Sequence, residues 1–173
     1  TYKSIRSMIS SPEHPFLWLV VKSGNGSIKS FKDLAGKKVG LFPGSTTEAL
    51  LKYILKKVGV DPNSVTMQPI AQPQQINALI AGSIDALFAL EPTPTVAEVQ
   101  GVGHKVESAD VYFPIPRYNV LYAVLKSYYR NNKDVIERIE KAQDKAVDYI
   151  RQNPDDARRV LTKYTPYDEN IVL

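Results

Sequence analysis

The fold is decided by residues 38–59, which read KVGLFPGSTTEALLKYILKKVG. The first five residues are mostly apolar and predict a short strand, and Pro43-Gly44 predicts a turn directly after it. Ser45 and Glu48 then have the spacing of a capping box, and apolar side chains recur every three or four residues up to a final glycine. This stretch therefore predicts one strand–turn–helix unit, with the glycine ending the helix.

The same unit recurs further along the chain. Strands are predicted to begin near residues 38, 64, 84 and 104, with helical segments between them. The strand at Ile84–Leu90 is almost wholly apolar, as expected where helices cover both faces of a sheet. A series of this kind predicts an α/β fold, with one Rossmann-like lobe built on a mainly parallel sheet.

The flanks of this series differ from it. Phe16–Lys22 predicts a strand that leads into the lobe, and Asn119–Lys126 predicts a strand that leads out of it. A long amphipathic helix is predicted from residue 131 or 132 to Asn153-Pro154, where a second helix starts. Thr165-Pro166 predicts the start of a third helix. The end of the chain is therefore expected to be helical and separate from the βαβ series.

The composition is that of a globular protein rather than a disordered or disulfide-bonded one. The 173 residues are 43% hydrophobic and 23% charged, and none is cysteine. Cysteine-ligated zinc, iron–sulfur clusters and thiol nucleophiles are therefore excluded. The longest apolar run, Phe16–Val21, has six residues, whereas a membrane-spanning helix needs about twenty.

Charge is unevenly distributed along the chain. Lys and Arg number 22 against 18 Asp and Glu, which gives a net charge of +4. Residues 1–60 hold ten basic and three acidic side chains, whereas residues 61–120 hold two basic and six acidic ones. The basic side chains near the start are scattered through turns and a helix face, and no aromatic residues alternate with them. This pattern favours a solvated surface over an interface for nucleic acid or acidic lipid.

Signatures of catalysis are mostly absent from the sequence. His14 and His104 lie far apart, and neither has a second histidine or a cysteine three or four residues away. There is no Gly-x-Ser-x-Gly elbow and no Walker-type phosphate loop. Near the end of the chain, carboxylates alternate with Lys and Arg at helical spacing, which is typical of solvated ion pairs. We therefore expect no catalytic residue, no metal site and no cofactor.

The turn at residues 43–47 is the strongest candidate for a binding site. It connects the carboxyl end of a predicted strand to the start of a helix, which is the edge where parallel α/β sheets bind ligands. The helix start offers unpaired N–H groups and a partial positive charge. The hydroxyls of Ser45, Thr46 and Thr47 add neutral donors, and Gly44 allows a close backbone approach. Such a cradle can bind an anion without a cationic side chain, although an ordinary helix cap has the same sequence.

Positions after the neighbouring strands are also polar. Gln72 lies at the start of the next predicted helix, and Glu91-Pro92 follows the apolar strand after it. Both can face a ligand at the same edge, or they can serve as a helix cap and a turn carboxylate. Tyr118 and Asn119 lie where the chain leaves the lobe. They are candidates for hinge or ligand residues, with ordinary turn residues as the alternative.

Several segments together resemble the NMT1/THI5-like group, the solute-binding proteins of ABC importers for nitrate, sulfonates, taurine and thiamine-precursor pyrimidines. The likeness runs from about residue 16 to residue 173 and rests on five loose motifs in the same order. They are FKDLAGKKVG at Phe31–Gly40, PGS at Pro43–Ser45, ALIAGSIDA at Ala78–Ala86, EP at Glu91-Pro92, and KAVDYI with the following NP and alanine at Lys145–Ala157. The resemblance implies a type II periplasmic-binding-protein-like fold, with a partial second lobe and C-terminal helices beside the Rossmann-like lobe.

The resemblance also implies a binding protein rather than an enzyme. Two lobes would close over a small anionic or polar solute and present it to the membrane permease of an ABC importer, with no role for nucleic acid. Ligand contacts are implied for Gly44, Ser45, Thr46 and Thr47 around the anionic end, for Gln72 and Glu91 on the opposite wall, and for Asn119. The implied location is periplasmic or otherwise extracytoplasmic, with a lipid anchor on the full-length protein as an option.

Members of this group are considerably longer than the present chain, which therefore resembles a fragment. Residues 1–22 would be the end of the first lobe and a crossing strand, residues 23–118 the second lobe, and residues 119–173 the return strand and helices of the first lobe. The strands at Phe16–Lys22 and Asn119–Lys126 would be the two hinge crossings. Such a fragment is expected to bind any solute weakly or not at all, because half of the site would be missing.

Two other functions stay open from the sequence. A ligand-sensing domain of a receptor or transcription regulator would have the same architecture, fused to a helix-turn-helix or a kinase. A thiamine-precursor enzyme is the third alternative, but those enzymes use cysteine and histidine motifs, and this chain has no cysteine. The hydroxyl cradle fits sulfonate, nitrate, carboxylate or a polar heterocycle equally well as the solute.

Overall fold

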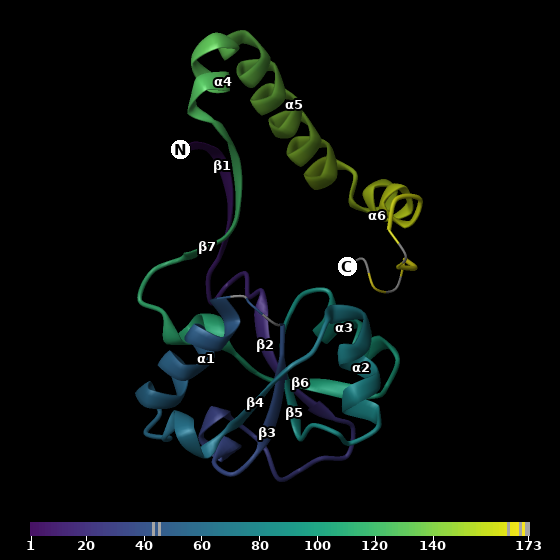
Figure 1. The fold of residues 1–173 in the computed structure, drawn as a ribbon. Coiled ribbons are helices and arrows are strands. Elements are labelled where there is room, and N and C mark those ends of the chain that lie inside the picture. The colour runs from purple at the N-terminus through teal and green to yellow at the C-terminus, as the bar shows by residue number, and fades with distance from the viewer. Residues whose placement is uncertain (43, 45, 166, 170, 172–173) are drawn as a thin grey trace. The chain divides into compact units, whose positions relative to one another are not determined.

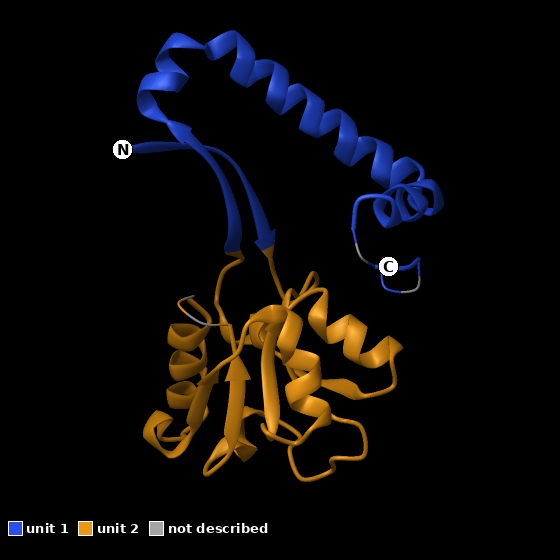
Figure 2. Ribbon diagram, turned by 45° about the vertical axis from the view of Figure 1, so that its right-hand side comes forward, with its two compact units in different colours: residues 1–9, 118–173 blue, residues 10–117 orange. Residues whose placement is uncertain are grey.

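The structure is a computed structural model that describes residues 1–42, 44, 46–165, 167–169 and 171. These residues form two compact units, which have separate colours in Figure 2. Unit 2 comprises Ser10–Arg117, and unit 1 comprises Thr1–Ile9 together with Tyr118–Leu173. The chain therefore passes between the units twice, once after Ile9 and once after Arg117.

Unit 2 is built on a five-stranded sheet. Its strands are β2 (Leu17–Lys22), β3 (Lys38–Leu41), β4 (Thr66–Pro69), β5 (Ala86–Leu90) and β6 (Gly103–Ser108). They lie in the order β4-β3-β5-β2-β6 (Figure 1). Parallel pairing joins β3 to both β4 and β5, whereas β2 pairs antiparallel with β5 and β6. Four of the five strands therefore point the same way, which confirms the predicted mainly parallel sheet.

Helices cover both faces of this sheet. They are α1 (Thr46–Lys57), α2 (Gln72–Ile80) and α3 (Thr93–Val99), with the short 3₁₀ helices η1 (Phe31–Leu34), η2 (Pro62–Ser64) and η3 (Ala109–Tyr112). Ile54 of α1 packs in one hydrophobic core with Phe88 of β5, and Leu79 of α2 packs in a second core with Leu87. Phe88 and Leu87 are neighbours on one strand, so their side chains point to opposite faces. The predicted strand–helix series is therefore a three-layer α/β lobe.

The start of this lobe differs from the predicted boundary at residue 22. The strand predicted as a crossing at Phe16–Lys22 is β2, which lies inside the sheet between β5 and β6. Its leucine and valine side chains are fully buried, because a strand inside a covered sheet has no face in contact with water. The near-continuous apolar run is the mark of such an interior strand. Unit 2 therefore begins at Ser10 rather than at residue 23.

Unit 1 contains most of the two crossing strands and three helices. These elements are β1 (Tyr2–Ser10), β7 (Arg117–Leu125), α4 (Lys126–Asn131), α5 (Lys133–Gln152) and α6 (Pro154–Thr162). The strands β1 and β7 pair with each other in a two-stranded sheet (Figure 1). Among the described residues of this unit, only Ile136 and Ala157 are buried apolar side chains. Most large apolar side chains of α5 and α6 are therefore partly exposed, each over about two fifths to one half of its surface.

In unit 1, the sequence patterns correctly predict α5 and α6. They do not predict β1 and α4, and they predict one helix that the described residues do not form. The third helix predicted from Thr165-Pro166 is not seen in the described part of this segment, where Thr165 is a bend and Tyr167–Glu169 are not helical. Pro166 itself, with residues 170, 172 and 173, lies outside the described residues.

Candidate functional site

Three helices of unit 2 begin at one edge of its sheet. Because β3, β4 and β5 are parallel, their carboxyl ends lie together, and Leu41 of β3 is the register partner of Pro69 on β4 and of Phe88 on β5. Each of these strands is followed within a few residues by a helix. Helix N-termini carry unpaired N–H groups and a partial positive charge. This edge, called the carboxyl edge below, is therefore suited to a polar or anionic ligand.

The loop before α1 contains the predicted cradle. Gly44 has a left-handed backbone conformation (φ +63°), is exposed, and has open space where a side chain would project. Thr46 is the exposed first residue of α1. Thr47 is buried, and its hydroxyl donates to the carbonyl of Phe42 (3.3 Å). Gly44 and Thr46 are therefore accessible at the carboxyl edge, whereas Thr47 ties the helix to the end of β3.

Part of the predicted cradle is not described by the structure. Pro43 and Ser45 lie outside the described residues. The predicted capping box depends on Ser45, so it lies outside them as well. The other member of that box, Glu48, forms an ion pair with Lys52 one turn further along α1 (2.5 Å), in which both side chains are half exposed. Exposed pairs at this spacing contribute little to stability.

The first residues of α2 and α3 are linked to each other. Gln72 Nε2 donates a hydrogen bond to Thr93 Oγ1 (3.3 Å), so the predicted site residue Gln72 lies beside the start of α3. Gln72 is exposed, whereas Thr93 is buried. The N-cap residues of these helices are Ala71 and Pro92, and neither caps its helix with a side chain. Two helix starts at the carboxyl edge therefore lack an N-cap side chain.

Glu91 is held in place by a cluster of charged and hydroxyl groups. Lys105 Nζ lies 2.9 Å from Glu91 Oε1 and 3.3 Å from Glu98 Oε2, and it also donates to Thr95 Oγ1 (2.9 Å). The second Glu91 oxygen accepts from the backbone N–H of Thr95 in the first turn of α3 (3.3 Å). The Glu91 and Lys105 side chains are 22% and 20% exposed. These contacts hold the Glu91 side chain in place. Since a carboxylate has about four acceptor positions, Glu91 can still accept a hydrogen bond from a ligand.

A second polar cluster, which the sequence patterns do not predict, lies after the carboxyl end of β6. Asp110 is 2% exposed, and its Oδ2 accepts from the backbone N–H groups of Phe16 (2.9 Å) and Leu17 (3.2 Å). Its Oδ1 accepts from the Ser10 hydroxyl and from Arg117 Nη2 (2.6 Å). Burial by itself raises the pKa of Asp110, but these hydrogen bonds and the Arg117 charge outweigh it and hold that pKa below its usual range.

One property of the sequence points to both clusters. Lys105 and Arg117 are the only basic residues in the segment 61–120, which has six acidic residues. Each of the two forms an ion pair with a shielded carboxylate, Glu91 or Asp110. In this chain, the two isolated cations of the acidic segment therefore mark both ion pairs, which hydrophobic periodicity does not reveal.

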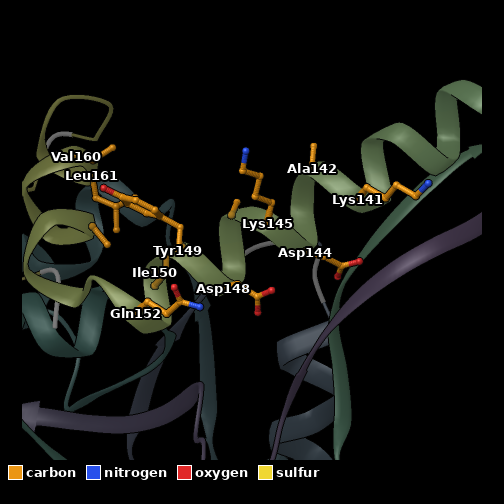
Figure 3. A pocket seen from close by; sticks show the side chains of 12 residues that line it. Lys141, Ala142, Asp144, Lys145, Asp148, Tyr149, Ile150, Gln152, Val160 and Leu161 are labelled. Atoms are coloured by element: carbon orange, nitrogen blue, oxygen red, sulfur yellow. The ribbon is translucent and has the colours of Figure 1, made fainter.

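Unit 1 contains one predicted residue and one apolar groove. Asn119 is partly buried and lies on β7. Because this part of β7 belongs to unit 1, Asn119 is not among the predicted site residues that the sheet of unit 2 brings together. A groove of about 860 Å³ runs along α5 and α6, with Tyr149 of α5 pointing toward Leu161 of α6 (Figure 3). Most of its surface is apolar, and half of its lining residues are polar or charged, among them Lys141, Asp144 and Lys145. The groove is a partly exposed helix face without converging polar groups.

The carboxyl edge offers hydrogen bonds rather than reactive groups, namely N–H groups, hydroxyls, an amide and a fixed carboxylate. Within the described ranges, His, Cys, Asp and Glu side chains form no group of three that could hold a metal ion. Over that same part of the chain, no helix combines the length and the apolar character needed to cross a bilayer.

The fold is shared with solved periplasmic binding proteins. The periplasmic aliphatic sulphonate binding protein SsuA from Escherichia coli matches with a TM-score of 0.81 and 18% identity, over 99% of this chain and 57% of that protein. The alkanesulfonate-binding protein SsuA from Xanthomonas axonopodis pv. citri, solved with bound MOPS, matches with a TM-score of 0.79 and 15% identity. At these identities the likeness establishes the fold class, which is that of the periplasmic binding proteins, as the motifs imply.

The family follows from the sequence comparison. The NMT1/THI5-like family model matches residues 3–157, so the chain belongs to the NMT1/THI5-like family. A relative from Brachyspira hyodysenteriae, provisionally named an ABC transporter periplasmic binding protein, is 32% identical over 76% of this chain and 38% of its own length. A Haemophilus influenzae protein, provisionally named a thiamine biosynthesis protein, is 24% identical over 98% of this chain and 52% of its own length. The chain thus spans about two fifths to one half of these relatives.

Proposed function

We propose that the protein binds a small anionic or polar solute at the carboxyl edge of unit 2 and delivers it to the membrane permease of an ABC importer. The observation that carries this proposal is the convergence of three helix N-termini at one sheet edge, beside the exposed Gly44 and Thr46. Names of similar proteins support the proposal. The Brachyspira hyodysenteriae relative is named as an ABC transporter periplasmic binding protein, and the two SsuA structures are named as sulfonate-binding proteins. A periplasmic or otherwise extracytoplasmic location is part of the proposal.

The two sides of the carboxyl edge differ in charge, which orients the proposed solute. At α3, Glu91 and Glu98 share the single ammonium of Lys105, so this side carries a net negative charge. At α1, the Thr46 side chain is exposed and its hydroxyl can donate, and the helix N-terminus carries a partial positive charge. The anionic head of the solute is therefore proposed to bind at α1, and its hydrogen-bond donors near Gln72 and Glu91. Asn119, from unit 1, is proposed as a further contact.

A second lobe is needed to enclose a solute bound at this edge. The relatives are about twice as long as this chain, and the apolar side chains Ile150 and Leu161 of α5 and α6 are 49% and 38% exposed. We infer that further polypeptide of the protein packs against this helix face and completes a lobe around unit 1. Closure of that lobe would bury the solute and form the surface that a permease recognises.

A thermal-shift screen of the intact protein tests the proposed function. The solutes are alkanesulfonates, nitrate, short carboxylates and hydroxymethylpyrimidines, with a neutral sugar as the negative control. A solute present at about one hundred times its dissociation constant should stabilise the protein by about 2.7 kcal/mol. A screen in which none of the four classes raises the melting temperature more than the sugar does would contradict the proposal.

The cradle assignment predicts a specific loss of affinity. Thr46→Ala should weaken the binding of the best anionic solute by about 1 kcal/mol, or roughly fivefold in Kd, because one cleft donor is removed. Thr66→Ala is the matched control, since Thr66 is an exposed threonine at the opposite end of a strand in the same sheet. Titration calorimetry measures both variants. Equal affinities of the two variants would rule out the cradle at α1.

A thiamine-precursor pyrimidine is the second candidate solute. The observation that favours it is the Haemophilus influenzae relative, which is named for thiamine biosynthesis and aligns with nearly the whole chain. A pyrimidine has no anionic head, so it would depend on the amide of Gln72 and the carboxylate of Glu91 rather than on α1. Binding of a pyrimidine that Thr46→Ala leaves unchanged would identify this alternative.

A further inference from the structure

The two points where the chain passes between its units converge on one side chain. Unit 2 ends at Ser10 on the incoming side and at Arg117 on the outgoing side. Asp110 Oδ1 accepts hydrogen bonds from both, from the Ser10 hydroxyl and from Arg117 Nη2 (2.6 Å). Ser10 and Arg117 are separated from each other by more than half of the chain. Their shared contact therefore comes from the fold and not from local sequence.

Asp110 is itself fixed firmly to unit 2. It lies in η3, and its backbone N–H donates to Ser108 Oγ at the end of β6 (3.1 Å). Its Oδ2 accepts from the N–H groups of Phe16 and Leu17, at the start of the interior strand β2. The side chain is 1% exposed, so water does not compete for these bonds. One carboxylate oxygen thus contacts the sheet, and the other contacts the two crossings.

The outgoing crossing has a second attachment to unit 2, and the incoming crossing continues into a hydrogen-bonded turn. The Arg117 guanidinium lies over the Phe113 ring (4.5 Å), and Phe113 stacks on Tyr53 of α1 (5.4 Å, 17° between planes). On the incoming side, Ser11 and His14 exchange backbone hydrogen bonds (3.2 and 3.0 Å) in the turn that leads to β2. The outgoing crossing is therefore linked through two aromatic rings to the helix that begins at the proposed cradle.

We propose that Asp110 is a positioning residue that clamps both crossings to unit 2, so that bending between the units is confined to β1 and β7 beyond Ser10 and Arg117. The inference rests on the proposed function, because closure over a solute requires a pivot of defined position. Without the clamp, the pivot would extend into residues 11–16 and 113–117, and the units would sample a wider range of orientations. No contact between Asp110 and a solute is part of this inference.

The chemistry of Asp110→Asn makes it a selective test. The Asn carbonyl oxygen can still accept from the Phe16 and Leu17 N–H groups, while its NH₂ group presents donors toward Arg117, which is itself a donor. Arg117→Met is the second variant, because it keeps an apolar stem near Phe113 and removes the donors. Glu107→Gln is the matched control. Glu107 accepts from the Phe31 N–H (2.8 Å) and the Tyr112 hydroxyl (2.5 Å), and both partners lie within unit 2.

The readout is the distance distribution between two spin labels, one on each unit, measured by double electron–electron resonance without any solute. The chain has no cysteine, so Asn63→Cys in unit 2 and Glu137→Cys in unit 1, both exposed, provide unique attachment sites. We expect a wider distribution in Asp110→Asn and in Arg117→Met than in the parent, and an unchanged width in Glu107→Gln.

Two results would overturn the clamp. One is an unchanged width in either folded clamp variant. The other is an equal widening in Glu107→Gln, which would show that any loosening of unit 2 has the same effect. Because no solute is present, failure here leaves the proposed binding function standing, and failure of the solute screen leaves the clamp standing.

Discussion

Two carboxylates at the carboxyl end of the sheet depend on one cation each, but they are buried to different degrees. The Asp110 side chain is 1% exposed and that of Arg117 is 13% exposed, whereas the Glu91 and Lys105 side chains are 22% and 20% exposed. Removing one partner of a buried pair leaves an unsolvated charge, which costs about 3–5 kcal/mol, whereas exposed pairs contribute about 1 kcal/mol or less. Asp110 is therefore expected to matter more for stability than Glu91.

This difference gives a prediction for Asp110 that depends on pH. Asp110→Asn should lower the free energy of unfolding by about 3 kcal/mol at neutral pH, because the Arg117 charge loses its counter-ion. The folded protein holds the pKa of Asp110 below its ordinary value. The carboxylate's stabilisation is therefore fully present above the unfolded pKa of about 3.9 and is lost as pH falls through the lower folded value.

Urea unfolding of the parent and of Asp110→Asn across a series of pH values measures this effect. The gap between the two free energies of unfolding should be constant around neutral pH and should narrow below about pH 4. A gap that keeps its full size under acid conditions would show that Asp110 stabilises the fold by its shape rather than by its charge.

Local patterns predict the elements of unit 2 well, because each of these elements is specified by neighbouring residues. The apolar run of β5, the periodicity of α1 and the glycines after helices are all visible within short windows. The strand β2 was predicted but was assigned to a crossing, although its near-continuous apolar run is typical of a strand inside a covered sheet. β1 has no such run, and it pairs with β7, which lies more than 100 residues further along the chain.

The sequence predicts the part of the candidate site that depends on the strand–helix series, but not the Asp110 cluster. Gly44, Gln72 and Glu91 follow three parallel strands, so the βαβ pattern alone places them at one edge, and their contact with a solute stays a prediction. The Asp110 cluster was not predictable in this way. Ser10 and Asp110 are 100 positions apart, and no periodicity relates them. Contacts of this range become visible only when the fold is known.

The turn before α1 gives a prediction at the scale of one element. Gly44→Ala should lower the free energy of unfolding by about 1 kcal/mol, because φ is +63° there and a Cβ is disfavoured in that conformation. No atom outside the two neighbouring residues lies within 4 Å of the added Cβ, so the cost comes from the backbone conformation rather than from packing. Gly26→Ala is the control, since Gly26 also has open space but no positive φ.

Chemical denaturation of both glycine variants provides the measurement. Gly26→Ala should be neutral or slightly stabilising, because alanine reduces the freedom of the unfolded chain. Equal effects of the two substitutions would show that the loop before α1 does not require its left-handed turn.

The two units differ sharply in how much apolar surface they bury. Unit 2 has two hydrophobic cores, whereas the described residues of unit 1 include only two buried apolar side chains, Ile136 and Ala157. Since burial of apolar surface is the main favourable term in folding, unit 1 has little to stabilise it within these residues. A two-stranded sheet such as β1–β7 is also marginal in water without further packing.

This imbalance predicts the order of amide protection in the 173-residue chain. Hydrogen exchange should be slowest in β2 and β5, and the amides of β1, β7, α5 and α6 should exchange through openings of much lower free energy. Mass spectrometry of peptides after timed exchange gives the comparison directly. Protection in α5 that equals protection in β5 would mean that unit 1 is stable without the additional polypeptide proposed to cover its apolar face.

The most direct test of the central claim is to map solute binding onto the amides of the protein by NMR. An alkanesulfonate is titrated into the ¹⁵N-labelled protein, and shift changes are assigned residue by residue. We predict that the largest changes fall on Gly44, Thr46 and Gln72, at the carboxyl edge of unit 2. Changes concentrated at Gly36 and Thr66, near the opposite ends of the same strands, or along the α5–α6 groove would contradict the account.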